Sequence, residues 1–158
     1  GVLSSAVSIH CSDSLKYYTL RRHRTVYGGG GIMPDFFVPL DTTRYTKLHR
    51  QLAAKSIIVN ANLRYIDVHR KALQAEYKQF DKFNNSCEIP QSVIDGIIEE
   101  GKKQKVEAKD DEELKHTIAA LKVQLKALVA RDLWDMSQYF QIMNETNDVV
   151  MKAVELIK

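Results

Sequence analysis

Residues that break helices are scarce in this sequence of 158 residues. It holds three prolines and seven glycines, and four of the glycines form a single run at residues 28–31. Because proline and glycine most often interrupt regular structure, the rest of the chain favours helix. Apolar residues at 44% and charged residues at 27% are close to the averages of globular proteins, which excludes wholesale disorder.

The sequence also lacks long apolar segments and a strong excess of one charge. No stretch reaches the ~20 apolar residues that span a bilayer, and no cleavable signal opens the chain. The net charge is +3, of which residues 1–43 carry only +1, whereas a nucleic-acid binder usually concentrates positive charge on one face. We therefore expect no nucleic-acid partner, and we interpret the basic cluster Arg21–Arg24 as a charged surface turn rather than a phosphate site.

Metal and disulfide motifs are missing as well. Cys11 and Cys87 form no framework, and their spacing leaves both their pairing and the redox compartment open. The histidines are scattered singly, without His-Glu-x-x-His or Cys-x-x-Cys, so we expect no metal site and no cofactor. They are His10, His23, His49, His69 and His116. His49 and His69 lie among lysines and arginines, which favours exposure to solvent.

The first forty residues have the pattern of short strands. Apolar and polar residues alternate at 7–12, and two β-prone runs at 17–20 and 25–27 flank the basic turn, which predicts a hairpin. Two or three short strands cannot bury both faces of a sheet. We therefore expect residues 1–43 to be an incomplete part of a larger sheet.

From residue 42 onward, apolar residues recur every three or four positions, as in helices. We expect a first helix capped by Asp41, Thr42 or Thr43, a second at 57–77, a break at 84–86, and a third helix whose first turn contains Pro90. A charged connector follows at 102–111. The core-facing residues predicted for the second and third helices are Ile58, Ala61, Tyr65, Val68, Ala72, Leu73, Val93, Ile94, Ile97 and Ile98.

The last segment is the most regular. Leucine and isoleucine recur at 114, 118, 121, 125 and 128, after which the apolar stripe shifts sideways twice. These shifts favour a bundle over a coiled coil, with a break expected near 144–148; whether one helix or several precede it is open. The predicted fold class is mainly α: a bundle-like helical domain at 44–158, preceded by the incomplete β segment.

No residues form a recognisable catalytic set. The glycine run lacks the Gly-Lys-Ser/Thr ending of a phosphate loop, so it reads as a backbone device that allows positive φ and close approach of a neighbouring strand. Asp132 and Asp135 could form an acid pair, but solvation or pairing with Arg131 is the commoner fate. Trp134, the sole tryptophan, is expected to anchor a core or an interface.

Three segments of the N-terminal region together resemble a known family. They are Asp-Ser-Leu-Lys-Tyr at 13–17, Arg-Thr-Val-Tyr-Gly-Gly-Gly-Gly-Ile-Met-Pro-Asp at 24–35, and Phe-Val-Pro-Leu-Asp-Thr-Thr at 37–43. They are similar to bacterial carboxy-terminal processing peptidases, also called tail-specific proteases, which are serine endopeptidases. Residues 125–136 and 144–148 resemble an envelope-associated subgroup. The family motif comprises Gly28, Gly29, Gly30, Gly31, Ile32, Pro34 and Asp35.

The resemblance implies a parent with a substrate-tail reader and a core that uses a Ser/Lys dyad. Both dyad motifs would lie upstream of the glycine run, and neither occurs in residues 1–158, so no catalytic residue is assigned here. The chain would be the C-terminal portion of such a peptidase, in the bacterial envelope and in the periplasm. Its partners would be protein or peptide substrates, bound by the missing upstream domains, and further copies of itself, through helices or edge strands.

Two expectations remain beside this one. The chain could instead be a free-standing helical interaction or oligomerisation module without activity. Relatives commonly place a glycine in the turn at 22–24; His23 would be mildly strained there at a positive φ, which leaves the geometry of this turn open.

Overall fold

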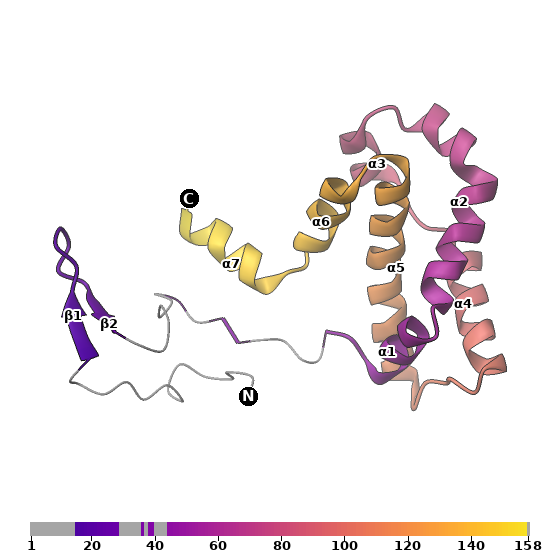
Figure 1. Cartoon of the computed structure of the whole chain (residues 1–158). Helices are drawn as coiled ribbons and strands as arrows, with labels where there is room; N and C mark the ends of the chain where they lie inside the picture. The colour runs from indigo at the N-terminus through magenta and orange to yellow at the C-terminus, as the bar shows by residue number, and fades with distance from the viewer. Residues whose placement is uncertain (1–14, 29–35, 37, 40–43, 158) are drawn as a thin grey trace. The chain divides into compact units, whose positions relative to one another are not determined.

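A computed structural model describes residues 15–28, 36, 38–39 and 44–157. The chain divides into two units, residues 1–41 and 42–158. The first contains a two-stranded hairpin, and the second is helical (Figure 1). The mainly α fold class predicted from the sequence is thus confirmed. In the part of the chain that is described, no helix combines the length and apolarity needed to cross a membrane.

The predicted hairpin is present. Strands β1 (Lys16–Tyr18) and β2 (Thr25–Tyr27) pair antiparallel, with Tyr17 opposite Val26. The connecting turn is closed by Thr19, whose N–H donates to the Arg24 carbonyl at 3.0 Å and whose hydroxyl accepts from the Arg24 N–H at 3.0 Å. The turn geometry left open by the sequence places His23 at φ 45°, in the left-handed region. The strand predicted at 7–12 lies outside the described residues.

The described side chains of strands β1 and β2 are exposed to solvent. Every residue of β1 is exposed, and Tyr17 retains 58% of its accessible surface. The ring of Tyr17 lies over Gly28, where a Cβ would stand 2.7 Å from the ring carbon Cε2. The absence of a side chain at Gly28 is therefore what lets the ring pack on the backbone.

The described residues of the second unit form seven helices. They are α1 (Lys47–Ala54), α2 (Ile57–Glu76), α3 (Phe80–Ser86), α4 (Gln91–Lys103), α5 (Asp111–Leu133), α6 (Met136–Asn144) and α7 (Asp148–Ile157). The break predicted near 144–148 separates α6 from α7. A second break at Trp134 and Asp135 was not predicted; Asp135 caps α6 by accepting the Ser137 N–H at 2.6 Å.

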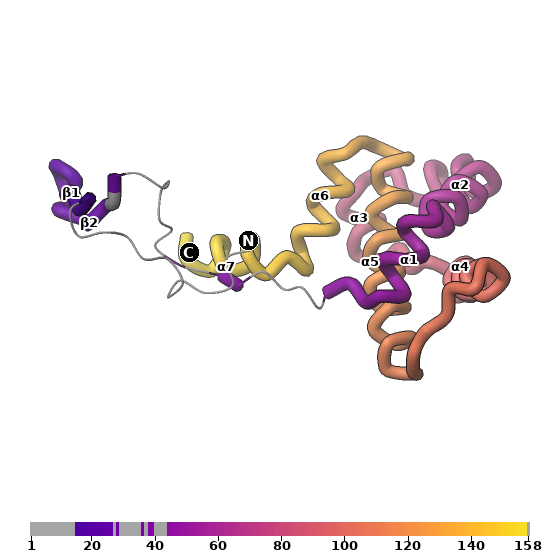
Figure 2. Tube along the Cα trace, turned by 60° about the horizontal axis from the view of Figure 1, so that its bottom comes forward, coloured from indigo at the N-terminus to yellow at the C-terminus, as the bar shows by residue number. Residues whose placement is uncertain are grey.

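Helix α5 is the centre of the bundle. Helices α1, α2, α4 and α6 all contact it, and Figure 2 shows it between α2 and α6. Its buried residues Leu121, Leu125 and Val129 face this core. Among the described residues, those of the buried apolar core are Leu48, Leu52, Ile57, Ile58, Ala61, Ile66, Leu73, Tyr77, Phe83, Cys87, Ile89, Ile94, Ile97, Val106, Leu121, Leu125, Ala127, Leu128, Val129, Ala130 and Ile142.

Three predictions about helix boundaries and faces are wrong. The first helix begins at Lys47 and is capped by the Thr46 hydroxyl, not by Asp41, Thr42 or Thr43. On α2, Val68 is 77% exposed and Ala72 is exposed too, because α5 packs against the side that carries Asn62 and Ile66.

The break predicted at 84–86 is helical, since these residues belong to α3. Tertiary contacts stabilise this short helix: Lys126 Nζ donates to the Asn84 carbonyl, and Asn84 Nδ2 donates to Glu145 Oε1 at 2.6 Å. Pro90 directly precedes α4, close to its predicted place, and both Ile94 and Ile97 are fully buried.

Two glycines of α4 should respond oppositely to alanine. A Cβ on Gly96 would meet nothing within 4 Å, so Gly96→Ala should raise the free energy of unfolding by about 0.5–1 kcal/mol through helix propensity. A Cβ on Gly101 would lie 2.7 Å from Leu52 Cδ2 and 3.1 Å from the Val106 carbonyl oxygen. Gly101→Ala should therefore lower the free energy of unfolding by about 1–2 kcal/mol. Urea unfolding of both variants measures these changes. If the free energy of unfolding changed in the same direction in both variants, the prediction would be wrong.

Candidate functional site

The candidate binding site is a hollow of about 250 Å³ on the outer side of α5. Its floor is low because Ala119 and Ala120 have short side chains, and Met143 of α6 closes one side. The residues that line it are Arg44, Tyr45, His116, Ala119, Ala120, Val123, Met143 and Thr146. This lining supplies one cation, one aromatic ring and one imidazole, but no serine, cysteine or carboxylate. It suits an apolar group beside positive charge rather than acyl transfer.

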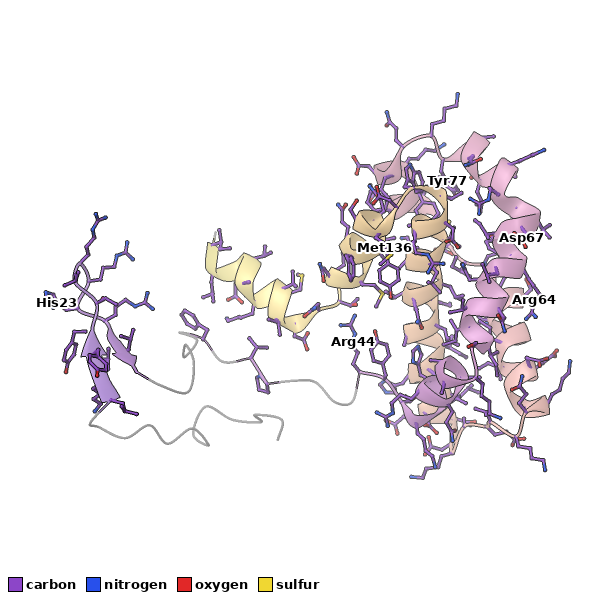
Figure 3. The ribbon with its side chains drawn as sticks, in the orientation of Figure 1. His23, Arg44, Arg64, Asp67, Tyr77 and Met136 are labelled. Atoms are coloured by element: carbon purple, nitrogen blue, oxygen red, sulfur yellow. The ribbon has the colours of Figure 1, made fainter. Side chains whose placement is uncertain are left out.

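Arg44 forms the rim of the hollow between the start of α1 and the end of α6 (Figure 3). Its guanidinium donates to the Met143 carbonyl at 3.2 Å and to the Thr146 hydroxyl at 2.5 Å. It also lies 5.5 Å from the centre of the Tyr45 ring. The contact with Met143 places a cation at the C-terminal end of α6, where positive charge is favourable.

Behind the hollow, polar groups join α1 to α5. The imidazole of His49 is stacked on Tyr45 with ring centres 4.6 Å apart, and its Nε2 lies 2.8 Å from Gln124 Oε1. The hydroxyls of Thr46 and Thr117 are 2.6 Å apart. His49 is only 4% exposed, so the solvent exposure predicted from its basic neighbours is wrong. Its side chain lies on the same face as Leu48 and Leu52, which α1 buries.

Stability should depend on pH through His49. Burial lowers the pKa of His49 below its usual 6.5, against the opposing hydrogen bond with Gln124. The unfolded chain therefore binds the His49 proton at a higher pH than the folded chain does. Well above pH 6.5, His49 should not affect the free energy of unfolding. As the pH drops through 6.5 toward the lowered pKa, the free energy of unfolding should fall. His49→Gln should lose part of the difference between about pH 7.5 and 5.5 in urea unfolding. An undiminished difference would contradict the prediction.

Glu113 fastens the N-termini of two helices together. Its Oε1 accepts the Leu48 N–H of α1 at 3.0 Å, and its Oε2 accepts the Lys109 N–H at 2.7 Å. The hydrogen bonds from Lys109 and Leu48 lower the pKa of Glu113 below its usual value. Asp110 caps α5 by accepting the Glu113 N–H at 2.8 Å. These carboxylates hold helix ends, which is a structural role.

A second buried polar cluster joins α2 to the end of α5. Asn62, which is fully buried, donates from Nδ2 to Asp132 Oδ2 at 2.6 Å, while Arg131 Nη2 lies 2.8 Å from Asp132 Oδ1. Arg70 donates to the Asp132 carbonyl at 2.5 Å. Of the two fates left open by the sequence, solvation or pairing with Arg131, Asp132 adopts the pairing. Asp135 belongs to the cap of α6, so the two aspartates do not form an acid pair.

Cys87 is a free, buried thiol. Burial raises its pKa, which disfavours the reactive thiolate. Burial also raises the pKa of its neighbour Tyr77 to about 12. Tyr77 makes an edge-to-face contact with Phe83, which in turn contacts Trp134. Trp134 is therefore a core anchor, as predicted. Cys11 lies outside the described residues.

The structure brings few of the sequence-predicted residues together. Of the family motif, Gly28 alone is described; Gly29, Gly30, Gly31, Ile32, Pro34 and Asp35 lie outside the described residues. His69 is exposed, as predicted, and its ring is tilted against that of Tyr65, with ring centres 4.7 Å apart. Residues 15–28, 36, 38–39 and 44–157 contain no group of three or more side chains that could hold a metal ion.

The sequence reading missed Arg44 and Asn62. Asn62 could have been found, since it stands between Ile58 and Ile66 at a spacing of four, where a polar residue on an apolar stripe is unusual. Arg44 precedes the helical pattern and carried no such signal.

Comparison with protein families gives one match. A family of unknown function (DUF8443) matches residues 48–135, from α1 to the residue before α6. This span is more than half of the chain. The chain belongs to the DUF8443 family. The matched span runs through α1 to α5 and includes Asn62 and Asp132 of this chain. No curated protein and no solved structure matches the chain.

Proposed function

We propose that this chain is the C-terminal portion of a bacterial tail-specific serine endopeptidase, in which the DUF8443 domain is a structural appendage to the protease core. The single observation that carries the proposal is the motif at residues 24–35, which joins β2 to the glycine run and leads into the helical domain. In such an enzyme a lysine accepts the proton of the serine nucleophile, and backbone N–H groups stabilise the oxyanion. Envelope location is part of the same proposal.

The exposure of the hairpin supports this assignment. Tyr17, Tyr18 and Val26 are large side chains that the two strands leave open to solvent. An isolated two-stranded hairpin is marginally stable in water, so these strands need further strands or a packed layer. A protease core that includes the hairpin would supply both.

The close contact at Gly28 gives the proposal a structural consequence. Because a Cβ there would collide with the Tyr17 ring, the glycine run starts where the backbone is already covered on one side. In the parent enzyme the run would lie against the neighbouring core strands. Gly28 is thereby expected to position the edge of the core, without touching the substrate.

The test uses the longer reading frame that includes this chain. A Ser and a Lys in protease context upstream of Val2 are expected, and the longer polypeptide should cleave casein or peptide tails. Alanine at the upstream serine should abolish turnover, and the chain of 158 residues alone should show none above background. Turnover by this chain alone, or an upstream frame without the Ser/Lys pair, would overturn the proposal.

A matched pair of variants in the longer polypeptide tests the role of the hairpin. Gly28→Ala should lower kcat/KM while leaving the unfolding of the helical domain unchanged. Gly96→Ala, which adds the same methyl group in open space, should leave kcat/KM unchanged. Equal activity of both variants would show that the contact between Tyr17 and Gly28 does not matter to the enzyme.

The second candidate function is an interaction module without activity. The exposed apolar helix at the C-terminal end of the described chain favours it. This module would have no protease core, so it is an alternative to the first proposal.

A further inference from the structure

Helix α7 is built to be buried on most of its surface. Its polar residues Asp148, Lys152 and Glu155 stand at spacings of four and three and so share one side. At 3.6 residues per turn they occupy an arc of about 60°, and the apolar residues take up about two thirds of the circumference. These apolar residues are Val149, Val150, Met151, Ala153, Val154, Leu156 and Ile157.

No residue of α7 is buried in the single chain. Half of the surface of Val149 and Met151 is open to solvent, and Ile157 is 85% exposed. Isolated helices shorter than about 12–15 residues are marginal in water, and α7 has 10 residues. A partner must therefore cover α7 for it to be a stable helix.

The hollow beside α5 offers apolar side chains to such a helix. Its floor of Ala119 and Ala120 lets a helix approach closely, and Val123 and Met143 give apolar walls. A helix that is apolar over most of its circumference needs a groove rather than a flat face.

The hollow of the same chain is out of reach for most of α7. Thr146, at its rim, is only two residues before the start of α7. Asn147 fixes that start, since its Oδ1 accepts the Val149 N–H at 3.1 Å. From there α7 extends away from α5, as both views show (Figures 1 and 2). Val154 and Ile157 therefore cannot enter the adjacent hollow unless the connection after α6 unfolds.

We propose that α7 of one chain packs into the α5–α6 hollow of a second copy, and reciprocally, in a two-fold symmetric dimer. Each large apolar side chain of α7 offers roughly 80–100 Å² for burial. The two helices and the two hollows together then approach the ~1,200–2,000 Å² that stable protein interfaces bury. Because the arrangement is reciprocal, each chain contributes both patches.

Charge favours this partner over a membrane surface. The side chains of α7 carry two acids and one lysine, and Lys152 is paired with Glu155 at 2.9 Å. Helices that bind anionic lipid are rich in lysine and arginine. The rim of the hollow instead carries the cation Arg44, which complements the acidic side of α7. The proposal does not depend on protease activity.

Sedimentation of the 158-residue chain tests the dimer, with matched valine variants. The wild-type chain is expected to be dimeric at about 100 µM, and Val154→Glu should raise the dissociation constant at least about tenfold. Val68→Glu places the same charge at an exposed valine of α2 and should leave the dissociation constant unchanged. A chain that stays monomeric at this concentration, or a dimer that Val154→Glu does not weaken, would overturn the proposal.

Cross-linking identifies the receiving surface. In a Cys11→Ser background, chains with Val154→Cys and chains with Ala120→Cys are mixed and treated with a short bismaleimide. A cross-linked heterodimer is expected, and chains with Val68→Cys in place of Val154→Cys should give none. Cross-links only between two Val154→Cys chains would overturn the role of the hollow. Binding of the monomeric chain to anionic vesicles, lost in Val154→Glu, would assign α7 to a membrane instead.

Discussion

Phe83→Ala is expected to lower the free energy of unfolding of the helical domain by about 3–5 kcal/mol, the range for deleting a buried aromatic ring. Phe83 is fully buried, and its ring makes edge-to-face contacts with Tyr77 at 5.4 Å and Trp134 at 5.3 Å between ring centres. The ring therefore ties α3 to the end of α2 and to the end of α5. Its removal should lower Tm by roughly 10–20 °C in a domain of this size.

The control for Phe83 lies on α6. Phe140 is 53% exposed and contacts Tyr139 edge-to-face, so Phe140→Ala should change the free energy of unfolding by less than about 1 kcal/mol. Thermal and urea unfolding of the two variants measure the difference. A loss for Phe83→Ala no larger than that for Phe140→Ala would refute the central place given to the aromatic cluster.

Asp132→Ala is expected to have the second largest effect, a loss of about 2–4 kcal/mol. The substitution removes the acceptor of a fully buried amide, Asn62 Nδ2, and the partner of the half-buried Arg131. Asn62 already has one unpaired buried atom, Oδ1, so the variant would bury the whole amide without a partner. An unpaired buried polar group carries the full penalty of desolvation.

Asp132→Asn separates geometry from charge. Asparagine keeps an acceptor oxygen for Asn62 but loses the ion pair with Arg131, so a loss of only about 1 kcal/mol is expected. Urea unfolding at pH 7 compares the two variants. If Asn and Ala at this position destabilised equally, the ion pair with Arg131, and not the hydrogen bond to Asn62, would hold the cluster together.

Local signals predicted the existence of most elements. The hairpin followed from β-prone runs on both sides of a polar turn, and the helices from apolar residues spaced by three and four. The sequence also indicated the anchoring role of Trp134 and the pairing of Asp132 with Arg131, because each depends on residue type and on neighbours along the chain. The hollow could not be predicted from the sequence, because it forms where α5, α6 and Arg44 meet.

The wrong predictions share one cause, which is that a neighbouring helix decides what a periodic pattern leaves open. On α2, a face with Val68 and a face with Ile66 both fit helical spacing, and packing on α5 selected Ile66. His49 has exposed basic neighbours along the chain, yet its own side chain faces Gln124 of α5. At 84–86, contacts from Lys126 and Glu145 outweigh the poor helix propensity of asparagine and serine.

The amino-acid sequence by itself determined a mainly helical chain with a short, uncovered hairpin, because helix and hairpin signals act over a few residues. Only the tertiary structure decided which faces are buried, where the polar clusters join α1 and α2 to α5, and that α7 lacks cover within one chain. These features depend on contacts between residues that lie 60 to 100 positions apart in the sequence. The spacing of neighbouring residues carries no information about such contacts.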